Sequence, residues 1–291
     1  MPELPDLTVV AEALHAALAG RPIMAASAPA PLAVRGTPQE LTGLRGQLVI
    51  SIRRRGKLLC MDLDRDGVVV NPMLTGRFQL ATVGAKLPAR TAVVFRFGPR
   101  GAGPGDQAAW TSRATWIPAD SMETEVRFRD RTQMGKVYLL PLGVGRSVPG
   151  FGGDEQGPDA DDPALDLDTW RVRIRRQNGE LKSILRNQAF VAGIGNAYSD
   201  EILHAARLLP MRRRSSLATE EVDELYRALR SVLSAAIGVL RERVPPTFET
   251  QVRDFLAVHL KGGSPCPRCG APISELKAGG SVTSFCRRCQ R

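Results

Sequence analysis

Two cysteine pairs near the C-terminus constrain this chain more than any other feature. Cys266 and Cys269 form one CxxC motif, Cys286 and Cys289 form a second, and sixteen residues separate the two pairs. Two such pairs at this spacing are typical of a tetrahedral zinc site with four cysteine ligands. Four thiolates leave no coordination position for water, so we expect one structural Zn2+ that holds a hairpin between the pairs. Four unligated thiols are the alternative interpretation.

The excess positive charge lies entirely in the C-terminal part of the 291-residue chain. From Arg171 to Arg291 there are 21 Lys and Arg against 11 Asp and Glu, whereas the first 170 residues carry 19 of each. A basic region of this size favours nucleic acid as the partner, with a solvated basic surface as the alternative. No apolar run reaches the ~18 residues of a membrane span, and no basic amphipathic helix indicates a membrane surface.

Apolar periodicity divides the chain into a strand-rich part and a helical part. Helical spacing predicts a helix that begins after Asp6 and ends near Gly20, and short runs between Gly and Pro clusters predict strands at 23–142. The fold class is therefore α+β. We expect an antiparallel β-sandwich with an N-terminal helix at 1–145, an acidic Gly- and Pro-rich linker at 146–168, helices at 169–262, and the zinc hairpin at 263–291.

The first residues can carry covalent chemistry. If Met1 is removed, Pro2 becomes an N-terminal secondary amine, which can attack a sugar carbon and form an iminium. Glu3 follows directly, and its carboxyl could donate a proton to a sugar oxygen and later accept one. A Met-Pro start is common, so an N-terminal tail without chemistry is the alternative interpretation of these residues.

Five motifs in order resemble the formamidopyrimidine-DNA glycosylase and endonuclease VIII family of base-excision repair enzymes. The resemblance extends over nearly the whole chain. Its motifs are Met1-Pro2-Glu3-Leu4-Pro5, Arg54-Arg55-Gly56-Lys57, Leu74-Thr75-Gly76-Arg77, Gly193-Ile194-Gly195-Asn196 followed by Asp200-Glu201, and the cysteine hairpin ending Cys289-Gln290-Arg291. It implies a helix-two-turn-helix DNA-binding domain at 169–262.

The resemblance also implies roles for particular residues. Pro2 would attack C1′ of a flipped-out damaged nucleotide, and Glu3 would assist ring opening and proton transfer. Lys57 matches the family's lysine, which contacts a phosphate beside the lesion. Asn196 and the amides around Gly195 match its backbone clamp, in agreement with the preference of helix N-termini for phosphate.

The zinc hairpin departs from the family pattern. Enzymes of the formamidopyrimidine type usually carry an arginine five positions before the third cysteine, where this chain has Ser281. We expect Lys277, Arg287 or Arg288 to supply the missing phosphate contact.

The residues that would fill the gap left by the flipped nucleotide also differ. The family commonly uses a methionine, an arginine and a phenylalanine, whereas the matching positions here are Leu74, then Thr132 or Gln133, then Met134. An uncharged residue lacks the paired guanidinium donors with which arginine reads the opposite base. The preference for a particular opposite base should therefore be weaker. The short segment from Val252 to His259 leaves little room for a lesion-capping loop.

Together these features predict a bifunctional DNA glycosylase and AP lyase that removes oxidised pyrimidines or ring-opened purines from double-stranded DNA, with abasic sites also accepted. We expect a monomer in the cytoplasm, associated with the nucleoid and not with a membrane. Two alternatives remain open. One is a non-enzymatic or weakly active binder of damaged or abasic DNA, which Ser281 favours. The other is a zinc-hairpin transcription or RNA-binding module, which would not explain Pro2, Glu3 and Lys57 together.

Overall fold

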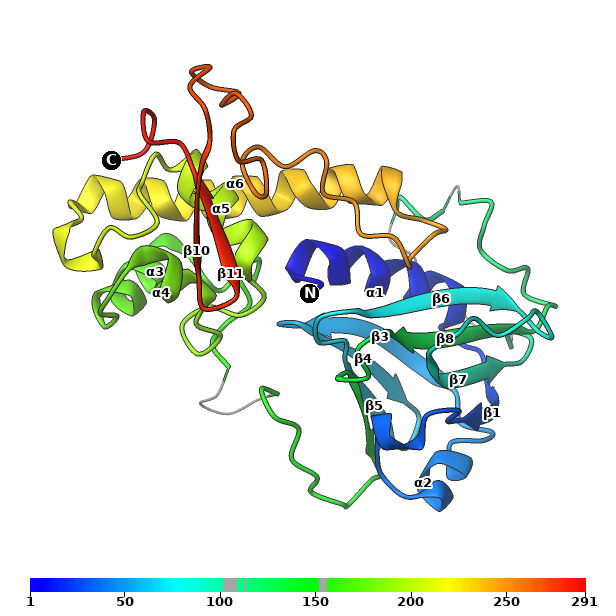
Figure 1. The fold of residues 1–291 in the computed structure, drawn as a ribbon. Helices are drawn as coiled ribbons and strands as arrows, with labels where there is room; N and C mark the ends of the chain where they lie inside the picture. The colour runs from blue at the N-terminus through cyan, green and yellow to red at the C-terminus, as the bar shows by residue number, and fades with distance from the viewer. Residues whose placement is uncertain (102–108, 113, 152–155) are drawn as a thin grey trace. The chain divides into compact units, whose positions relative to one another are not determined.

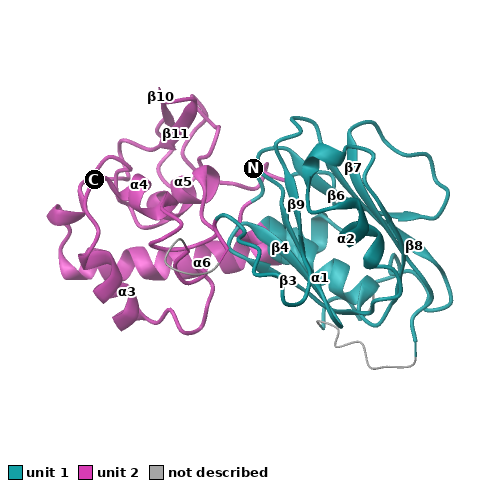
Figure 2. Ribbon diagram, turned by 90° about the horizontal axis from the view of Figure 1, so that it is seen from below, with its two compact units in different colours: residues 1–2, 6–149, 239–251 teal, residues 3–5, 150–238, 252–291 magenta. Residues whose placement is uncertain are grey.

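A computed structural model describes residues 1–101, 109–112, 114–151 and 156–291. The chain divides into two compact units (Figure 2). The β unit comprises Met1–Pro2, Asp6–Pro149 and Val239–Gln251, and the helical unit comprises Glu3–Pro5, Gly150–Gly238 and Val252–Arg291. The chain therefore passes from one unit to the other between Pro2 and Glu3.

The described part of the β unit contains two sheets (Figure 1). The four-stranded sheet has the order β1 (Ile23–Ser27), β7 (Thr91–Phe97), β8 (Thr124–Asp130), β6 (Gly76–Thr82). The five-stranded sheet has the order β2 (Val34–Arg35), β9 (Lys136–Leu140), β5 (Gly67–Asn71), β4 (Leu58–Leu63), β3 (Val49–Arg55). The neighbouring strands are antiparallel except β2 and β9, which pair in parallel. The predicted antiparallel sandwich therefore has one parallel pair, at this short edge strand.

Helix α1 (Leu4–Leu18) and both sheets share one apolar interior. Phe78 of β6 and Phe128 of β8 are cross-strand partners whose ring centroids lie 5.5 Å apart. Leu14 of α1 and Val68 of β5 line the same small interior space. This shared core confirms the predicted sandwich with an N-terminal helix. The helix begins at Leu4, so Asp6 lies in its first turn and not before its start as expected.

Two features of the β unit were not anticipated. A short helix, α2 (Pro38–Gly43), starts with a capping box. The side chains of Thr37 and Glu40 each accept a hydrogen bond from the other residue's backbone N–H. Lys57 lies in the two-residue turn of the β3–β4 hairpin, because Arg55 pairs with Leu58.

The helical unit contains α3 (Leu167–Arg175), α4 (Leu181–Arg186), α5 (Asn196–Ala205) and most of α6 (Thr219–Arg243), whose last five residues belong to the β unit. Trp170, Tyr198 and Leu229 are fully buried in its core. Ala160 and Leu165, from the expected linker, are buried in the same core, whereas residues 152–155 of that linker lie outside the described residues. None of the described helices is long and apolar enough to cross a membrane.

The C-terminal hairpin consists of β10 (Ser274–Ala278) and β11 (Ser281–Phe285). Its two-residue turn, Gly279-Gly280, has positive φ values of 53° and 75°, which glycine adopts without the strain that a Cβ would cause. Val258, Ile273 and the buried cysteines Cys266 and Cys286 form a small separate core beneath the hairpin. A core this small needs a further crosslink, and the cysteine cluster supplies it.

Candidate active site and zinc centre

The four C-terminal cysteines form the expected metal site. Their Sγ atoms all lie within 4.8 Å of one another, with 3.9 Å between Cys266 and Cys289 and 3.5 Å between Cys269 and Cys286. Tetrahedral zinc with Zn–S bonds of ~2.3 Å requires sulfur separations of about 3.8 Å. The geometry therefore fits one structural zinc, and a closed set of four thiolates leaves the metal no catalytic position.

Side chains from the helical unit support the cysteine cluster. His204 of α5 places Nε2 3.4 Å from Cys266 Sγ. Burial, aided by the nearby Arg268 charge, lowers the pKa of His204 to about 4, so the ring is neutral at pH 7. Gln290 accepts a bond from the Cys286 N–H at 2.7 Å and donates to the Leu208 carbonyl at 2.7 Å. No sequence pattern indicated that His204 would lie beside a metal ligand.

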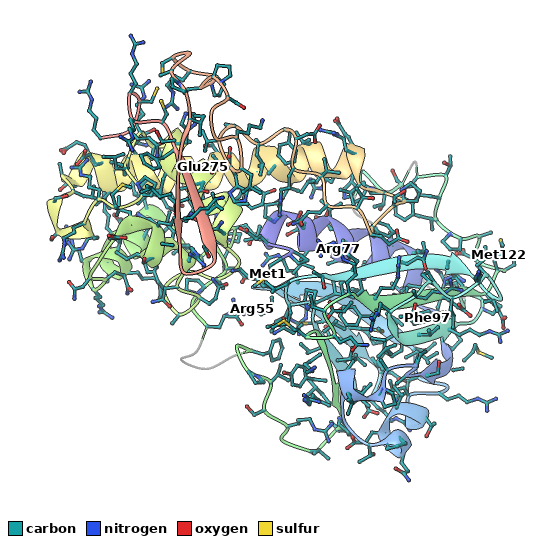
Figure 3. All side chains as sticks on the ribbon, in the orientation of Figure 1. Met1, Arg55, Arg77, Phe97, Met122 and Glu275 are labelled. Atoms are coloured by element: carbon teal, nitrogen blue, oxygen red, sulfur yellow. The ribbon has the colours of Figure 1, made fainter. Side chains whose placement is uncertain are left out.

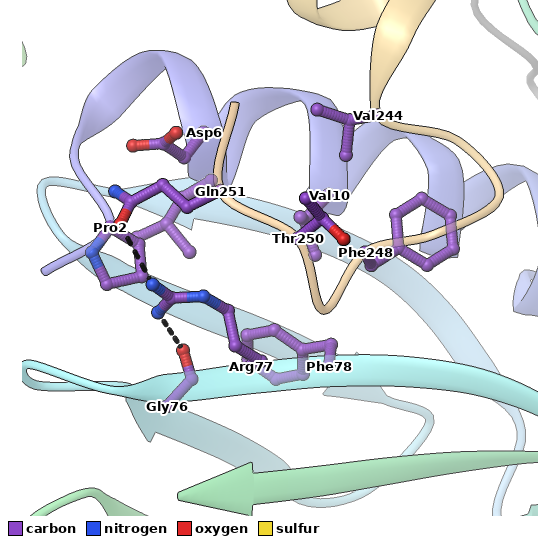
Figure 4. Close-up of a pocket in the computed structure, with 11 residues that line it drawn as sticks. Pro2, Asp6, Val10, Gly76, Arg77, Phe78, Val244, Phe248, Thr250 and Gln251 are labelled. Carbon is purple, nitrogen blue, oxygen red and sulfur yellow. Dashed lines mark hydrogen bonds between the residues drawn. The ribbon is translucent and has the colours of Figure 1, made fainter. Parts of the chain in front are cut away.

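Pro2 is buried at a narrow cavity of about 20 Å³ in the β unit, enough for one water molecule (Figure 4). Arg77 extends from β6 toward Pro2, donates to the Gly76 carbonyl at 2.7 Å and donates to Gln251 at 2.9 Å. Gln251 in turn donates to the Met1 carbonyl at 3.3 Å. Arg77 and Gln251 thus position the N-terminus, although no sequence argument had singled out Gln251.

The Glu3 carboxylate is held at the start of α5. It accepts hydrogen bonds from the backbone N–H groups of Gly195 at 2.6 Å, Ala197 at 2.9 Å and Tyr198 at 3.2 Å, and the residue is only 3% exposed. A Cβ on Gly195 would lie 2.5 Å from Glu3 Cδ, so only glycine fits there. Glu3 therefore occupies the anion-binding end of the helix with a fixed orientation.

The glycine turn holds a carboxylate of the chain itself. The amide of Gly195 was expected to bind a DNA phosphate, but in this structure it binds the Glu3 carboxylate. The turn also fixes the neighbouring residue, because the Leu4 N–H donates to the Gly193 carbonyl at 2.9 Å. The turn thus holds the acidic residue that follows Pro2 in the chain, and the expected phosphate contact of Gly195 stays a prediction.

Asn196 joins α5 to the zinc hairpin. Its Nδ2 donates to the Val282 carbonyl at 2.8 Å, while its buried Oδ1 has no hydrogen-bond partner among the described residues. Lys182 of α4 reinforces the connection with bonds to Asp200 at 2.6 Å and to Thr283 at 2.9 Å. The expected phosphate contact of Asn196 stays a prediction.

The expected basic contacts lie at accessible positions. Lys277 is exposed on β10 and faces Val282 across the hairpin, and Arg287 and Arg288 are exposed between the third and fourth cysteines. Ser281 opens β11 and is half-buried, as is Lys57 in the β3–β4 turn. Their contacts with DNA stay predictions.

The four residues predicted to fill the DNA gap lie on two neighbouring turns of the β unit. Leu74 is 48% exposed and Met134 is 44% exposed, so both apolar side chains are accessible from solvent. Thr132 and Gln133 are also exposed, and Thr132 Oγ1 lies 2.9 Å from Thr75 Oγ1. The structure thus brings the 74–75 turn and the 132–134 turn together.

Asp130 organises these two turns. Its buried carboxylate accepts hydrogen bonds from the Thr75 hydroxyl, from the Gly135 N–H at 2.6 Å, and from the Thr132 N–H and hydroxyl at 3.2 Å and 3.1 Å. Burial opposes ionisation, but these bonds outweigh it and hold the pKa of Asp130 below its usual range. Asp130 was not among the predicted site residues.

Replacement of Asp130 with asparagine is expected to lower the unfolding free energy by about 1–3 kcal/mol at pH 7, because an amide cannot accept all four bonds. A depressed carboxyl pKa stabilises the fold above the unfolded-state value of about 3.9, and this stabilisation is lost as the pH falls further. The deficit of Asp130→Asn should therefore shrink below about pH 4. Denaturant unfolding at pH 7 and pH 3 measures both effects. Asp168→Asn, at a side chain that is 86% exposed, is the control and should stay within about 0.5 kcal/mol of wild type.

Comparison with known proteins shows three family matches in chain order. Residues 1–137 match the formamidopyrimidine-DNA glycosylase N-terminal domain, 156–244 match the formamidopyrimidine-DNA glycosylase H2TH domain, and 263–291 match a zinc finger found in FPG and IleRS. The formamidopyrimidine-DNA glycosylase of Heliobacterium modesticaldum is 31% identical over 300 residues, with 100% of both chains covered.

Two solved structures have the same fold. The Lactococcus lactis Fpg in complex with abasic-site DNA matches with a TM-score of 0.82 and 26% identity over 99% of both chains. MutM in complex with DNA containing carbocyclic 8-oxo-G matches with a TM-score of 0.81 and 25% identity over 100% of both chains. This fold, with the cysteine cluster and a buried Pro2-Glu3 start, defines a base-excision DNA glycosylase.

The chain belongs to the formamidopyrimidine-DNA glycosylase family, whose members are DNA glycosylases and AP lyases. Full-length similarity to named enzymes does not favour a DNA binder without turnover. The transcription or RNA-binding alternative was wrong, because family matches also cover the two parts that precede the zinc finger.

Proposed function

We propose that this chain removes damaged bases from double-stranded DNA and cuts the strand at the resulting abasic site, with Pro2 as the nucleophile and Glu3 as the proton-transfer group. The observation that carries this proposal is the position of Glu3. Its carboxylate directly follows Pro2 in the chain and is held by three amides of one helix start. A fixed carboxylate beside an amine suits a reaction that needs both attack and proton transfer.

In the proposed reaction, the nitrogen of processed Pro2 forms a bond to C1′ and the glycosidic bond to the base breaks. The base leaves with the bonding electron pair and takes up a proton from water. Glu3 accepts the N–H proton of the new ammonium and passes it to the sugar ring oxygen, the ring opens, and the nitrogen lone pair forms the iminium. The iminium acidifies the C2′ proton, whose loss expels the phosphate at C3′ and cuts the strand. Water then hydrolyses the iminium and regenerates the free amine.

The proposed lesions are oxidised pyrimidines and ring-opened purines, together with abasic sites. Two features support this class over intact 8-oxoguanine. The exposed Thr132 and Gln133 carry no charge to read the opposite base. The segment from Val252 to His259 is held at its end, because Glu201 accepts the N–H groups of residues 257–259 at 2.6–2.8 Å. A segment held in this way offers no long loop over a flipped base.

We further propose that the enzyme acts as a monomer on the nucleoid in the cytoplasm. A thiolate zinc site requires reduced cysteines, which the cytoplasm maintains. Lys57, Asn196 and the hairpin's basic residues Lys277, Arg287 and Arg288 would contact the DNA backbone. The division into 1–145, 146–168, 169–262 and 263–291 also stays a proposal, since residues 239–251 group with the β unit.

Glu3→Gln tests the proposed chemistry. On duplexes that each carry one defined lesion, the variant should lose base release by on the order of 10²- to 10⁴-fold, as expected for a removed proton-transfer group. Strand cutting at a preformed abasic site should fall much less, because the attacking amine is intact. Base release and strand nicking are measured on the same panel.

Glu201→Gln is a matched control for the structural cost of the Glu3 substitution. Glu201 also accepts three backbone N–H bonds within the helical unit, so its loss perturbs the fold in a similar way. It should retain base release close to wild type once folded. Equal losses in Glu3→Gln and Glu201→Gln would show that Glu3 only stabilises the fold.

A further inference from the structure

A second pocket in the β unit is strongly basic. It encloses about 300 Å³ and is lined by Arg77, Arg90, Arg129 and Arg131, against a single carboxylate from Glu249. Four guanidinium groups around one space repel one another unless an anion lies between them. The expected occupant is therefore an anion with several acceptor oxygens.

The backbone forces two of these arginines together. Arg77 of β6 and Arg129 of β8 are direct cross-strand partners, an arrangement that destabilises a sheet when both residues carry the same charge. Arg129 Nε is buried and has no hydrogen-bond partner among the described residues, and its Nη2 has only a 3.4 Å bond to the Ala89 carbonyl. A buried donor without an acceptor costs free energy that a bound anion would recover.

Arg90 is held at the pocket by a backbone conformation that arginine rarely adopts. Its φ is +65°, and its carbonyl accepts the Asp130 N–H at 3.1 Å. Through Asp130 this backbone bond ties Arg90 to the two turns that carry Leu74 and Thr132–Met134. The arginine pocket thus belongs to the same local structure as the residues proposed to enter the DNA.

The arginine pocket is also adjacent to the Pro2 cavity. Arg77 and Gln251 line both spaces, and Arg77 donates a hydrogen bond to Gln251 at 2.9 Å (Figure 4). Figure 3 labels Arg77, which belongs to strand β6. An anion in the pocket would therefore bind one side chain away from the residue that attacks the sugar.

We propose that the arginine pocket binds a phosphate group of the DNA beside the lesion. This inference rests on the proposed function, because it assumes that Pro2 faces the reacting sugar. Arginine guanidinium groups bind phosphate oxygens in pairs, which suits a site with four of them. The phosphate has two possible sources: an internal phosphodiester of the intact strand, or the terminal phosphate that strand cutting leaves.

The double variant Arg90→Gln/Arg131→Gln tests the pocket, because both residues are exposed and their loss should not unfold the chain. Arg45→Gln/Arg65→Gln is the matched control, since it removes the same charge from exposed arginines of the β unit that do not line the pocket. Affinity is measured against salt for three duplexes. One carries an uncut tetrahydrofuran abasic analogue, and two carry a one-nucleotide gap with either phosphate or hydroxyl ends.

If the pocket binds an internal phosphodiester, the pocket variant should bind the uncut duplex about tenfold more weakly than wild type. The slope of log affinity against log salt concentration should then be smaller by about 0.9. If the pocket binds the terminal phosphate, the pocket variant should bind the uncut duplex as wild type does. It should lose the preference for the gapped duplex with phosphate ends over the one with hydroxyl ends. The proposal is overturned if the pocket variant and the control variant have the same affinity and salt slope on all three duplexes. Borohydride trapping by wild-type protein is scored separately, so a failure of Pro2 chemistry cannot be mistaken for a failure of the pocket.

Discussion

Borohydride is expected to trap no protein–DNA adduct when the amino group of Pro2 is blocked. Borohydride reduces an iminium to a stable amine, so the processed wild-type protein should become covalently linked to DNA that contains a lesion or an abasic site. An N-terminal extension that is not removed makes the Pro2 nitrogen an amide, which is not nucleophilic. Trapping should then fall by roughly 10³-fold or more, as for other enzymes that lose their nucleophile.

Pro2→Gly gives an intermediate case. Glycine leaves a primary amine that can still form a Schiff base, but it lacks the ring that packs at the narrow cavity beside Arg77 and Gln251. Its trapping should be reduced without vanishing. Mass spectrometry of each purified protein establishes whether Met1 has been removed, and undamaged duplex is the negative control. Equal trapping by blocked and processed proteins would assign the nucleophile to another residue.

Cys286→Ser is expected to abolish zinc binding and DNA binding together. Cys286 is fully buried in the small core beneath the hairpin, beside Val258 and Ile273. In zinc fingers the metal contributes about 10–16 kcal/mol, so metal loss and hairpin unfolding are one event. Without the hairpin, Asn196 and Lys182 lose their bonds to Val282 and Thr283 of β11.

Metal content by elemental analysis and affinity for an abasic duplex measure the two losses. Cys60→Ala is the control, because Cys60 is a buried cysteine of β4 outside the cluster, and it should retain one zinc per chain. A Cys286→Ser protein that keeps one zinc and wild-type affinity would show that the cluster does not hold the hairpin.

Local patterns in the chain were sufficient for the zinc site and for the strand-rich and helical parts. Cysteine spacing and apolar periodicity express short-range geometry, so they can be interpreted without knowledge of the fold. The capping box of α2 also follows a local pattern, in which Thr37 precedes Glu40 by three residues, but it was not predicted. The parallel pairing of β2 with β9 had no such signal, because it joins segments about a hundred residues apart.

The partners of the site residues depended on contacts between distant segments. Glu3 binds amides 192 to 195 residues away, a support for its carboxylate that no local pattern indicated. Asp130 accepts a hydrogen bond from Thr75, 55 residues away, and Arg77 faces Arg129 only because β6 pairs with β8 in this register. Hydrogen-bond partners and like-charge neighbours are set by strand register and helix packing, and no local run of residues contains that information.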